Sequence, residues 1–430
     1  MIDHETCILG GGLAGLAASI YSGAPVYEAE GQGGGVAQSD RTDGFTFDRG
    51  IHILQTSNQV VLDLLSELGV EFRSHNRQAF IYSHRAYTPY PFQVNTSALP
   101  LGLRTRCVWQ FFNRDTKTKP ANYEEWIYQS VGKAFGDTFL IPYSDKFWTV
   151  HPREMTHEWT GNRDPQPTAR QVLRGAFWSR QTKIGTNSTF RYPIGEAGYG
   201  TVAQALARRA AQVYTGHRAV ELDTDRRLIR FSNGSTVRYQ SLISTLPLPE
   251  LIRISSQAPL EVVEAASRLR TNSIMVVNLG FGRPAPPDKH WVHFPERDVS
   301  FFRISYPHSF DPGVAPAGTY SVSAEVAYSD HRPIDKATIA DRVIADLRRV
   351  GAIRQDDPVI LKTTRDIKYA YCIYDTHRTE SLRVIHAWLR QVGITPSGRY
   401  GLWTYFWSDE AILSGKKSAE SVSRKKVEVS

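Results

Sequence analysis

Apolar residues near the N-terminus first form a short run and then recur at helical spacing. The run from Thr6 to Leu9 leads into a glycine turn, and small apolar residues at helical spacing follow from Leu13 to about Tyr21. A second short strand is expected from Pro25 to Tyr27. A strand, a helix and a strand within so few residues are typical of a βαβ unit, which implies a parallel sheet.

Further along the chain, the pattern changes between helix and strand several times. Helical spacing predicts helices at Val60–Leu68 and Thr201–Val213, an aromatic-rich helical region from Tyr123 to about Trp178, and a last helix from Asp409 to about Glu420. Apolar runs and alternation predict strands within Ile81–Val94, at Val220–Leu222, Leu228–Phe231 and Leu242–Ser244, and at Ile274–Phe281 and Tyr320–Val326. The order indicates an α/β chain with a helical insertion and a second sheet.

Charge and cysteine content narrow the kind of partner. The chain has 51 Lys and Arg against 43 Asp and Glu, a formal net charge of +8, and its basic residues are scattered. This distribution favours an anionic small molecule over a nucleic acid, although a solvated surface would look the same.

Cys7, Cys107 and Cys372 lie far apart without metal-ligand spacing, so we expect reduced core cysteines and no metal. Without a long apolar segment or a leader, we expect a cytoplasmic protein with no membrane span.

The first glycine turn carries the spacing of a dinucleotide-binding motif. Gly10 permits the tight turn, Gly12 allows close approach of a pyrophosphate, and Gly15 allows close helix packing. The phosphates would then meet the positive N-terminus of the following helix. Glu28, just after the second strand, is placed to accept hydrogen bonds from ribose hydroxyls.

A second glycine group, Gly33 to Gly35, follows soon after Glu28 and precedes the segment from Phe47 to His52. A nicotinamide dehydrogenase does not need this second group, whereas a longer ligand with an isoalloxazine ring does. The order of the motifs therefore favours FAD. From these motifs, the residues expected to contact FAD are Gly10, Gly12, Leu13, Ala14, Gly15, Glu28, Ala29, Gly34, Gly35, Val36, Gly50 and Ile51.

This series, closed by the strand that ends before Thr245 and by Gly398-Arg399, resembles the flavin proteins grouped with monoamine oxidases, protoporphyrinogen oxidases and UDP-galactopyranose mutases. The resemblance implies an α/β fold with a Rossmann-type, glutathione reductase-like FAD-binding domain, an inserted helical layer and a mixed β-sheet substrate domain. It also implies FAD contacts from His52, Val220, Thr245, Gly398, Arg399 and Asp409. We expect the FAD domain at residues 1–90, 191–255 and 391–430, the helical insertion at 91–190 and the substrate domain at 256–390.

The middle of the chain is similar to the mutase branch. The segment from Phe139 to Trp148 resembles the mutases' Tyr-x-x-Lys-x-Trp stretch, which implies that Phe139 and Tyr143 stack on a uracil and that Trp148 faces the substrate. The same resemblance implies that Arg163 grips a diphosphate from a mobile loop. It also implies that Arg303 and Glu325 lie on a strand pair at the substrate. An arginine can hold a diphosphate bidentately, which a lysine cannot.

Three further residues are carried over from the mutases, and several positions depart from their pattern. His52 matches a histidine near the flavin N5, Tyr371 matches a diphosphate-binding tyrosine, and Arg399 would lie by the flavin or the substrate. Gln55 replaces a histidine, Cys372 replaces the usual proline, Glu196 replaces a glycine, and the stretch from Arg163 to Arg191 is longer than in bacterial mutases. These departures leave the sugar and the nucleotide open.

Three functions remain open at this stage. The favoured hypothesis is a sugar-nucleotide mutase in which His52, Arg163 and Arg303 serve catalysis and N5 of reduced flavin attacks the anomeric carbon. The alternative enzyme is an FAD-dependent oxidase or desaturase, because the same fold serves both. The third is a flavin-bearing binding protein. A homodimer is also left open.

Overall fold

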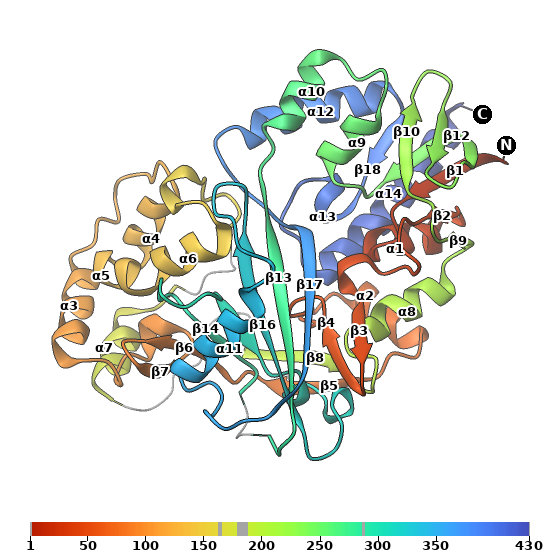
Figure 1. Cartoon of the computed structure of the whole chain (residues 1–430). Helices are drawn as coiled ribbons and strands as arrows, with labels where there is room; N and C mark the ends of the chain where they lie inside the picture. Colours follow the sequence, from red (N-terminus) through yellow and green to blue (C-terminus); the bar gives the residue numbers. More distant parts are fainter. Residues whose placement is uncertain (1, 162–165, 179–187, 286–288, 430) are drawn as a thin grey trace.

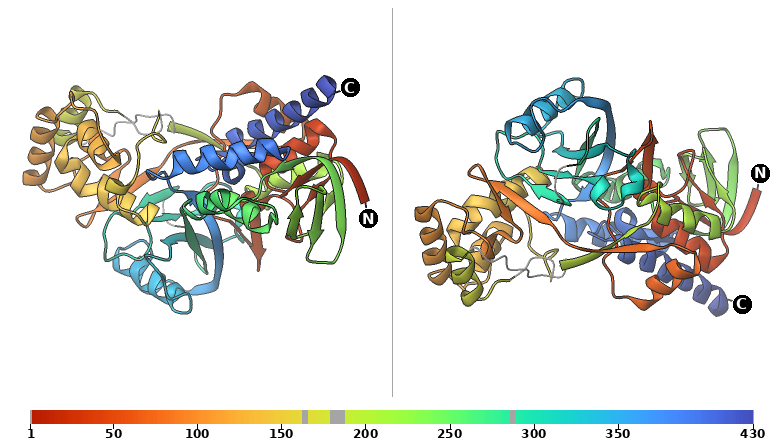
Figure 2. Two further views of the ribbon diagram at one scale, coloured as in Figure 1. Left: turned by 90° about the horizontal axis from the view of Figure 1, so that it is seen from above. Right: turned by 90° about the horizontal axis from the view of Figure 1, so that it is seen from below.

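The computed structural model describes residues 2–161, 166–178, 188–285 and 289–429, with side chains up to residue 424. Two large sheets and a layer of helices lie in a row, with the N- and C-termini at the end opposite the helical layer (Figure 1). The views from above and below show the same order (Figure 2). The expected α/β fold, with an inserted helical layer and a mixed second sheet, is confirmed.

The first sheet is built around the N-terminal strand. Parallel pairing joins β1 (Ile2–Leu9) to β2 (Val26–Tyr27) and β12 (Thr236–Ser244), β2 to β9 (Val213–Tyr214), and β12 to β18 (Ile394–Pro396). At one edge β10 (Ala219–Asp223) and β11 (Leu228–Phe231) add antiparallel strands. The predicted βαβ opening and its parallel sheet are therefore confirmed.

Helices cover both faces of this sheet. Apolar side chains of α1 (Leu13–Ser22) and α14 (Ser408–Val429) pack on one face, and α8 (Gly200–Arg209) packs beside α1. The other face is covered by α9 (Leu248–Ile254), α10 (Leu260–Ser267) and α12 (Arg378–Gln391). The last two lie within the 256–390 segment, yet they pack on the first sheet.

The second sheet has seven strands in the order β17-β13-β16-β15-β14-β6-β7. Their bounds are β17 (Val359–Cys372), β13 (Thr271–Phe281), β16 (Tyr320–Tyr328), β15 (Arg303–Ser305), β14 (Trp291–His293), β6 (Ala79–Ser83) and β7 (Ala86–Pro89). Pairing is antiparallel except between β14 and β6, and α11 (Ile339–Arg349) packs on one face. Strands β6 and β7 precede the boundary expected at residue 90 but belong to this sheet.

The helical layer comprises α3 (Leu101–Phe112), α4 (Tyr123–Val131), α5 (Lys133–Phe135), a π-helical turn (Gly136–Leu140), α6 (Ile141–Trp148) and α7 (Ala169–Phe177). Smaller elements complete the fold: α2 (Gln59–Glu67), α13 (Gly398–Gly401), and the pairs β3 (Ser39–Thr42) with β4 (Phe45–Asp48) and β5 (Phe72–Asn76) with β8 (Thr189–Pro193). Among the described residues, no helix is both long and apolar enough to traverse a bilayer, and no cluster of acidic, His or Cys side chains suits a metal ion.

Three sequence-based boundaries are wrong. Paired strands do not extend to Val94, because Pro89 and Pro91 lack the N–H that a strand ladder requires, and Phe92–Val94 forms a 3-10 turn instead. The helix expected to end at Val213 ends at Arg209, and β9 follows. The last helix extends beyond Glu420 to Val429.

Candidate active site

The N-terminus of α1 is open to a ligand. Gly12 caps the helix with φ −69° and ψ 178°, no side chain caps it, and the first turn has no acidic residue. A Cβ at Gly12 would meet nothing within 4 Å, whereas a Cβ at Gly10, at φ +92°, would overlap Thr245 Oγ1. Gly15 has no room for a Cβ because Gly10 O lies against it. The unbonded N–H groups and the space before them suit a pyrophosphate.

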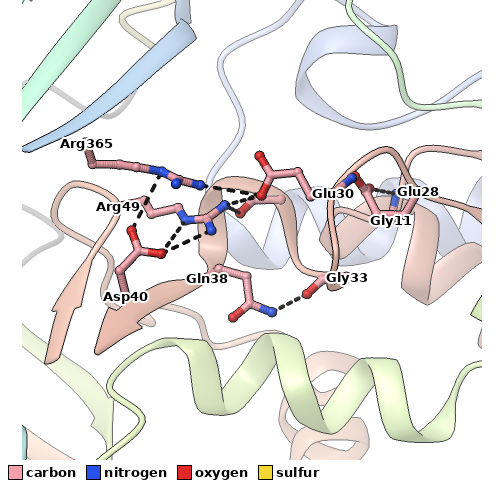
Figure 3. A network of polar contacts seen from close by, with 9 residues as sticks. Gly11, Glu28, Glu30, Gly33, Gln38, Asp40, Arg49 and Arg365 are labelled. Carbon is pink, nitrogen blue, oxygen red and sulfur yellow. Dashed lines mark hydrogen bonds and ion pairs between the residues drawn. The ribbon is translucent and has the colours of Figure 1, made fainter. Parts of the chain in front are cut away.

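Glu28 lies beside this turn. Its Oε2 accepts a hydrogen bond from Gly11 N at 2.6 Å, and its Oε1 accepts one from Glu30 N at 2.8 Å (Figure 3). A carboxylate has about four acceptor sites, so two remain for ribose hydroxyls. Ala29 follows directly, and His217 N donates to Glu28 O at 2.7 Å, which brings the segment before Val220 alongside. The Val220 side chain itself is 40% exposed.

The second glycine turn packs against the first. Gly34 N donates to Gly11 O at 2.6 Å, and positive φ angles of 125° at Gly34 and 56° at Gly35 form the turn, with Val36 directly after it. The Gln38 side-chain amide donates to Gly33 O (Figure 3). Backbone from both turns therefore lines the same space, as a ligand longer than a nicotinamide dinucleotide requires.

Arg49 holds this second turn in place, and sequence reasoning missed it. Its side chain is 7% exposed and donates to Glu30 Oε2 at 2.9 Å, to Gly35 O at 3.1 Å and to Asp40 Oδ1 at 3.1 Å. Arg365 on β17 approaches the same two carboxylates at 3.4 and 3.6 Å (Figure 3). This network ties the second sheet to the loop expected to hold FAD.

His52 follows Gly50 and Ile51 in the loop after β4. Its Nδ1 lies 3.1 Å from Gly50 O, so Nδ1 carries the hydrogen and donates it to that carbonyl. Burial lowers the pKa of His52 to about 4, which keeps the imidazole neutral. The His52 ring lies 5.4 Å from that of Tyr199.

Arg303 and Glu325 face each other across β15 and β16, which confirms the strand pair that the resemblance implied. Arg303 Nε donates to Glu325 Oε2 at 2.6 Å, and Glu325 Oε1 accepts from Ile51 N at 2.8 Å. Burial acts to lower the pKa of Arg303, but the nearby Glu325 carboxylate and the hydroxyls of Tyr371 and Tyr143 outweigh it and raise that pKa. One carboxylate thus links Arg303 to the loop that carries His52.

The two Nη groups of Arg303 have no acceptor in the described part of the protein, although the side chain is only 16% exposed. Its guanidinium lies 5.5 Å from the centre of the Phe302 ring. Tyr371 lies close by on β17, and its hydroxyl likewise has no partner among the described residues. These unused donors gather at one place beside Glu325.

The hydrogen-bond partners of His293 fix the direction of the Tyr143 hydroxyl. Trp291 Nε1 donates to His293 Nε2 at 3.2 Å, so His293 Nδ1 carries the hydrogen and donates to Tyr143 Oη at 2.8 Å. Burial, with Arg303 and Arg77 nearby, lowers the pKa of His293 well below its usual range. The Tyr143 hydrogen is therefore free to be donated elsewhere.

Aromatic rings form the wall of this region. Phe139 stacks on Tyr143 with ring centres 5.4 Å apart, and Trp148, 1% exposed, packs against Tyr371 and Tyr405 at 5.8 and 6.1 Å. A cavity of about 560 Å³ opens beside this wall, lined by residues that include Trp159, Tyr374, Arg378, Tyr405 and Trp407. Sequence reasoning missed Tyr405 and His293, although the dense aromatic run that follows Arg399 offered a signal for Tyr405.

The C-terminal segment closes the site. Gly398, at φ +74°, lies against Ala14 of α1, and Asp409 lies in the first turn of α14. The Arg399 guanidinium donates to Phe406 O at 3.0 Å and lies over the rings of Tyr371 and Tyr405 at 5.6 and 5.3 Å. Arg163 falls outside the described residues.

Comparison with known proteins shows the family to which this chain belongs. The family model for flavin containing amine oxidoreductases matches residues 25–423. The chain belongs to this family. FAD is therefore its cofactor, and the open α1 terminus, the two packed glycine turns and the half-satisfied Glu28 carboxylate fit that molecule.

Individual relatives of this flavoprotein span different activities. A solved structure of reduced UDP-galactopyranose mutase is 26% identical with a TM-score of 0.93, covering 98% of this chain and 94% of that one. A putative protoporphyrinogen oxidase from Exiguobacterium sp. 255-15 is 17% identical with a TM-score of 0.74, covering 99% of each chain, and shows the fold alone. A curated relative, coproporphyrinogen III oxidase of Bacillus subtilis (strain 168), is 21% identical over 402 residues, 83% of this chain and 85% of its own.

Proposed function

We propose that this FAD-dependent enzyme is a sugar-nucleotide mutase that acts as UDP-galactopyranose mutase does. The observation that carries the proposal is Arg303, a cation only 16% exposed that presents two Nη groups without an acceptor among the residues that the structure describes. Taking a charge out of water is costly unless a partner compensates, and Glu325 occupies only the Nε side. An anion that binds both Nη groups completes the set, and a diphosphate matches their planar geometry.

Neighbouring hydroxyls extend this anion site. Tyr371 and Tyr143 each have a hydroxyl hydrogen for which the described part of the chain offers no acceptor, and both hydroxyls lie near the Arg303 charge. Tyr143, which is half-buried, offers an aromatic ring next to these donors, which suits a nucleotide base, and the buried Phe139 stacks on that ring. The likeness to reduced UDP-galactopyranose mutase, at 26% identity and a TM-score of 0.93, supports the same choice.

The protein's residues would position the substrate and stabilise its leaving group. Arg303 and Tyr371 would bind the diphosphate and stabilise the charge that develops as the bond to the anomeric carbon breaks. Glu325 would fix the position of Arg303 relative to the loop at Ile51, since its carboxylate accepts hydrogen bonds from both residues. His52, neutral and anchored to Gly50 O, would orient groups near the flavin. Reduced flavin, when bound, supplies a nucleophilic N5. Arg163 stays a prediction as a second diphosphate ligand.

The rival function is an FAD-dependent oxidase, which the curated coproporphyrinogen III oxidase relative supports. An oxidase takes electrons from its substrate and passes them to an acceptor, so the substrate bleaches oxidised flavin. A mutase rearranges its substrate without net redox change and works only when its flavin is already reduced. The flavin redox state therefore separates the two.

Arginine variants test the diphosphate site. Arg303→Lys keeps the charge but loses the planar donor pair, so we expect kcat/KM for UDP-galactopyranose to fall about 100-fold or more. Arg283→Lys is the matched control: Arg283 pairs with the buried Asp357 at 3.0 Å and is 23% exposed, yet it lies in the bend that follows the end of β13 at Phe281. Unchanged kcat/KM in Arg303→Lys, or an equal loss in both variants, would contradict the assignment.

A further inference from the structure

The outer helices of the helical layer expose an unusual set of side chains. Every exposed Trp and Phe in the described part of the chain lies in α3 or α7 or directly after α7. The exposed apolar residues here are Leu101, Trp109, Phe112, Leu173, Phe177 and Trp178, with exposed fractions between 38% and 64%. Soluble surfaces rarely gather so many large apolar side chains without a partner.

The two helices lie side by side. Arg104 on α3 donates to Ala176 O on α7 at 2.9 Å, and the core-facing residues Cys107, Phe111 and Val172 belong to one buried cluster. Both helices lie at the end of the molecule opposite the termini (Figures 1 and 2). Their exposed residues therefore form one surface, the aromatic-arginine face, which comprises the six apolar residues above together with Arg106, Arg170 and Arg174.

The charge of this face has one sign. Arg106, Arg170 and Arg174 are exposed, Arg104 is half-buried, and neither Leu101–Phe112 nor Ala169–Phe177 contains an acidic residue. A second copy docked by the same face would place arginine against arginine, which is unfavourable. A negatively charged surface with an apolar interior is complementary to both features.

We propose that the aromatic-arginine face binds the surface of an anionic lipid bilayer. Trp, Phe and Leu side chains would enter the boundary between headgroups and acyl chains, and the arginines would lie against the phosphates. The enzyme would then be a peripheral membrane protein, which needs no spanning helix. This inference goes beyond the proposed mutase activity and does not rest on it.

Vesicle binding by the full-length, FAD-loaded protein tests the proposal. We expect the protein to sediment with vesicles of phosphatidylcholine and phosphatidylglycerol and much less with phosphatidylcholine alone. Replacing both Arg106 and Arg174 by alanine should weaken binding to the anionic vesicles roughly 30-fold, because each basic residue at such a surface contributes about fivefold. Trp109→Ser with Phe112→Ser should weaken it about tenfold or more.

A matched control and a second measurement keep the test decisive. Leu260→Ser with Val263→Ser removes apolar residues of 74% and 44% exposure from α10, which also carries Glu261 and Glu264, and should leave vesicle binding unchanged. Flavin absorbance confirms that every variant is folded. Absence of vesicle binding would overturn the proposal. So would a dimer, measured by light scattering, that the Trp109 and Phe112 substitutions separate, since a second copy would then cover this face.

Discussion

A methyl group at Gly12 should separate FAD binding from folding. The backbone there, at φ −69° and ψ 178°, suits alanine, and a Cβ would meet no protein atom within 4 Å. Alanine is a poorer N-cap than glycine, so the apoprotein of Gly12→Ala should lose only about 1 kcal/mol of stability. The same methyl would enter the space in front of the α1 N–H groups, where we expect the pyrophosphate to lie.

The expected loss of FAD affinity follows from those N–H groups. A hydrogen bond to a charged group is worth about 1.5–3 kcal/mol, so displacing the pyrophosphate from one of them weakens FAD binding roughly 10- to 150-fold. FAD titration of the apoprotein by flavin fluorescence measures this change, and chemical denaturation of the apoprotein measures stability. Gly15→Ala is the contrasting variant: its Cβ overlaps Gly10 O, so it should destabilise the apoprotein itself. Wild-type FAD affinity in Gly12→Ala would refute the reasoning.

Three other perturbations have defined outcomes. Gly415→Ala places a Cβ on Ala14 O where α14 packs on α1, and should lower the unfolding free energy by about 1–3 kcal/mol in denaturant titrations. Wild-type stability in this variant would contradict the close packing of α14 on α1. Burial raises the pKa of Asp48 to about 6, above its unfolded value, so the stability that this group contributes falls as pH rises from about 4 to about 6. Unfolding measured across that range should lose this slope in Asp48→Asn, and an unchanged slope would contradict it. Because burial lowers the pKa of His52 to about 4, its ring resonances in NMR should not titrate near pH 6.5. A titration midpoint near pH 6.5 would contradict the burial of this ring.

The cofactor half of the site was predictable because its chemistry depends on backbone shape. Gly10, Gly12, Gly15 and Glu28 lie within one βαβ unit, and local spacing therefore determined their arrangement. The Arg303–Glu325 pair came instead from the family resemblance, since the apolar pattern predicted only the strand Tyr320–Val326 that carries Glu325. Family resemblance then supplied the order of these parts.

Other features could not be predicted because they depend on contacts between distant segments. Arg49 gains its role only when Glu30 and Asp40, the two carboxylates that Arg365 of β17 also contacts, lie beside it. The Tyr143 hydroxyl is oriented only when β14 brings His293 beside α6. The pairing of β6 with β14, more than 200 residues away, could not be predicted for the same reason. Helix α3 escaped notice because Gly102 and mixed polar positions obscure its spacing.

The most direct test of the mutase proposal compares two redox states of the same enzyme. The purified protein would be incubated anaerobically with UDP-galactopyranose, once with oxidised flavin and once after reduction by dithionite, and the products separated by chromatography. The proposal predicts a ring isomer of the substrate from the reduced enzyme alone, with no change in flavin oxidation state. Substrate-driven bleaching of the oxidised flavin, or no isomer in either state, would contradict it.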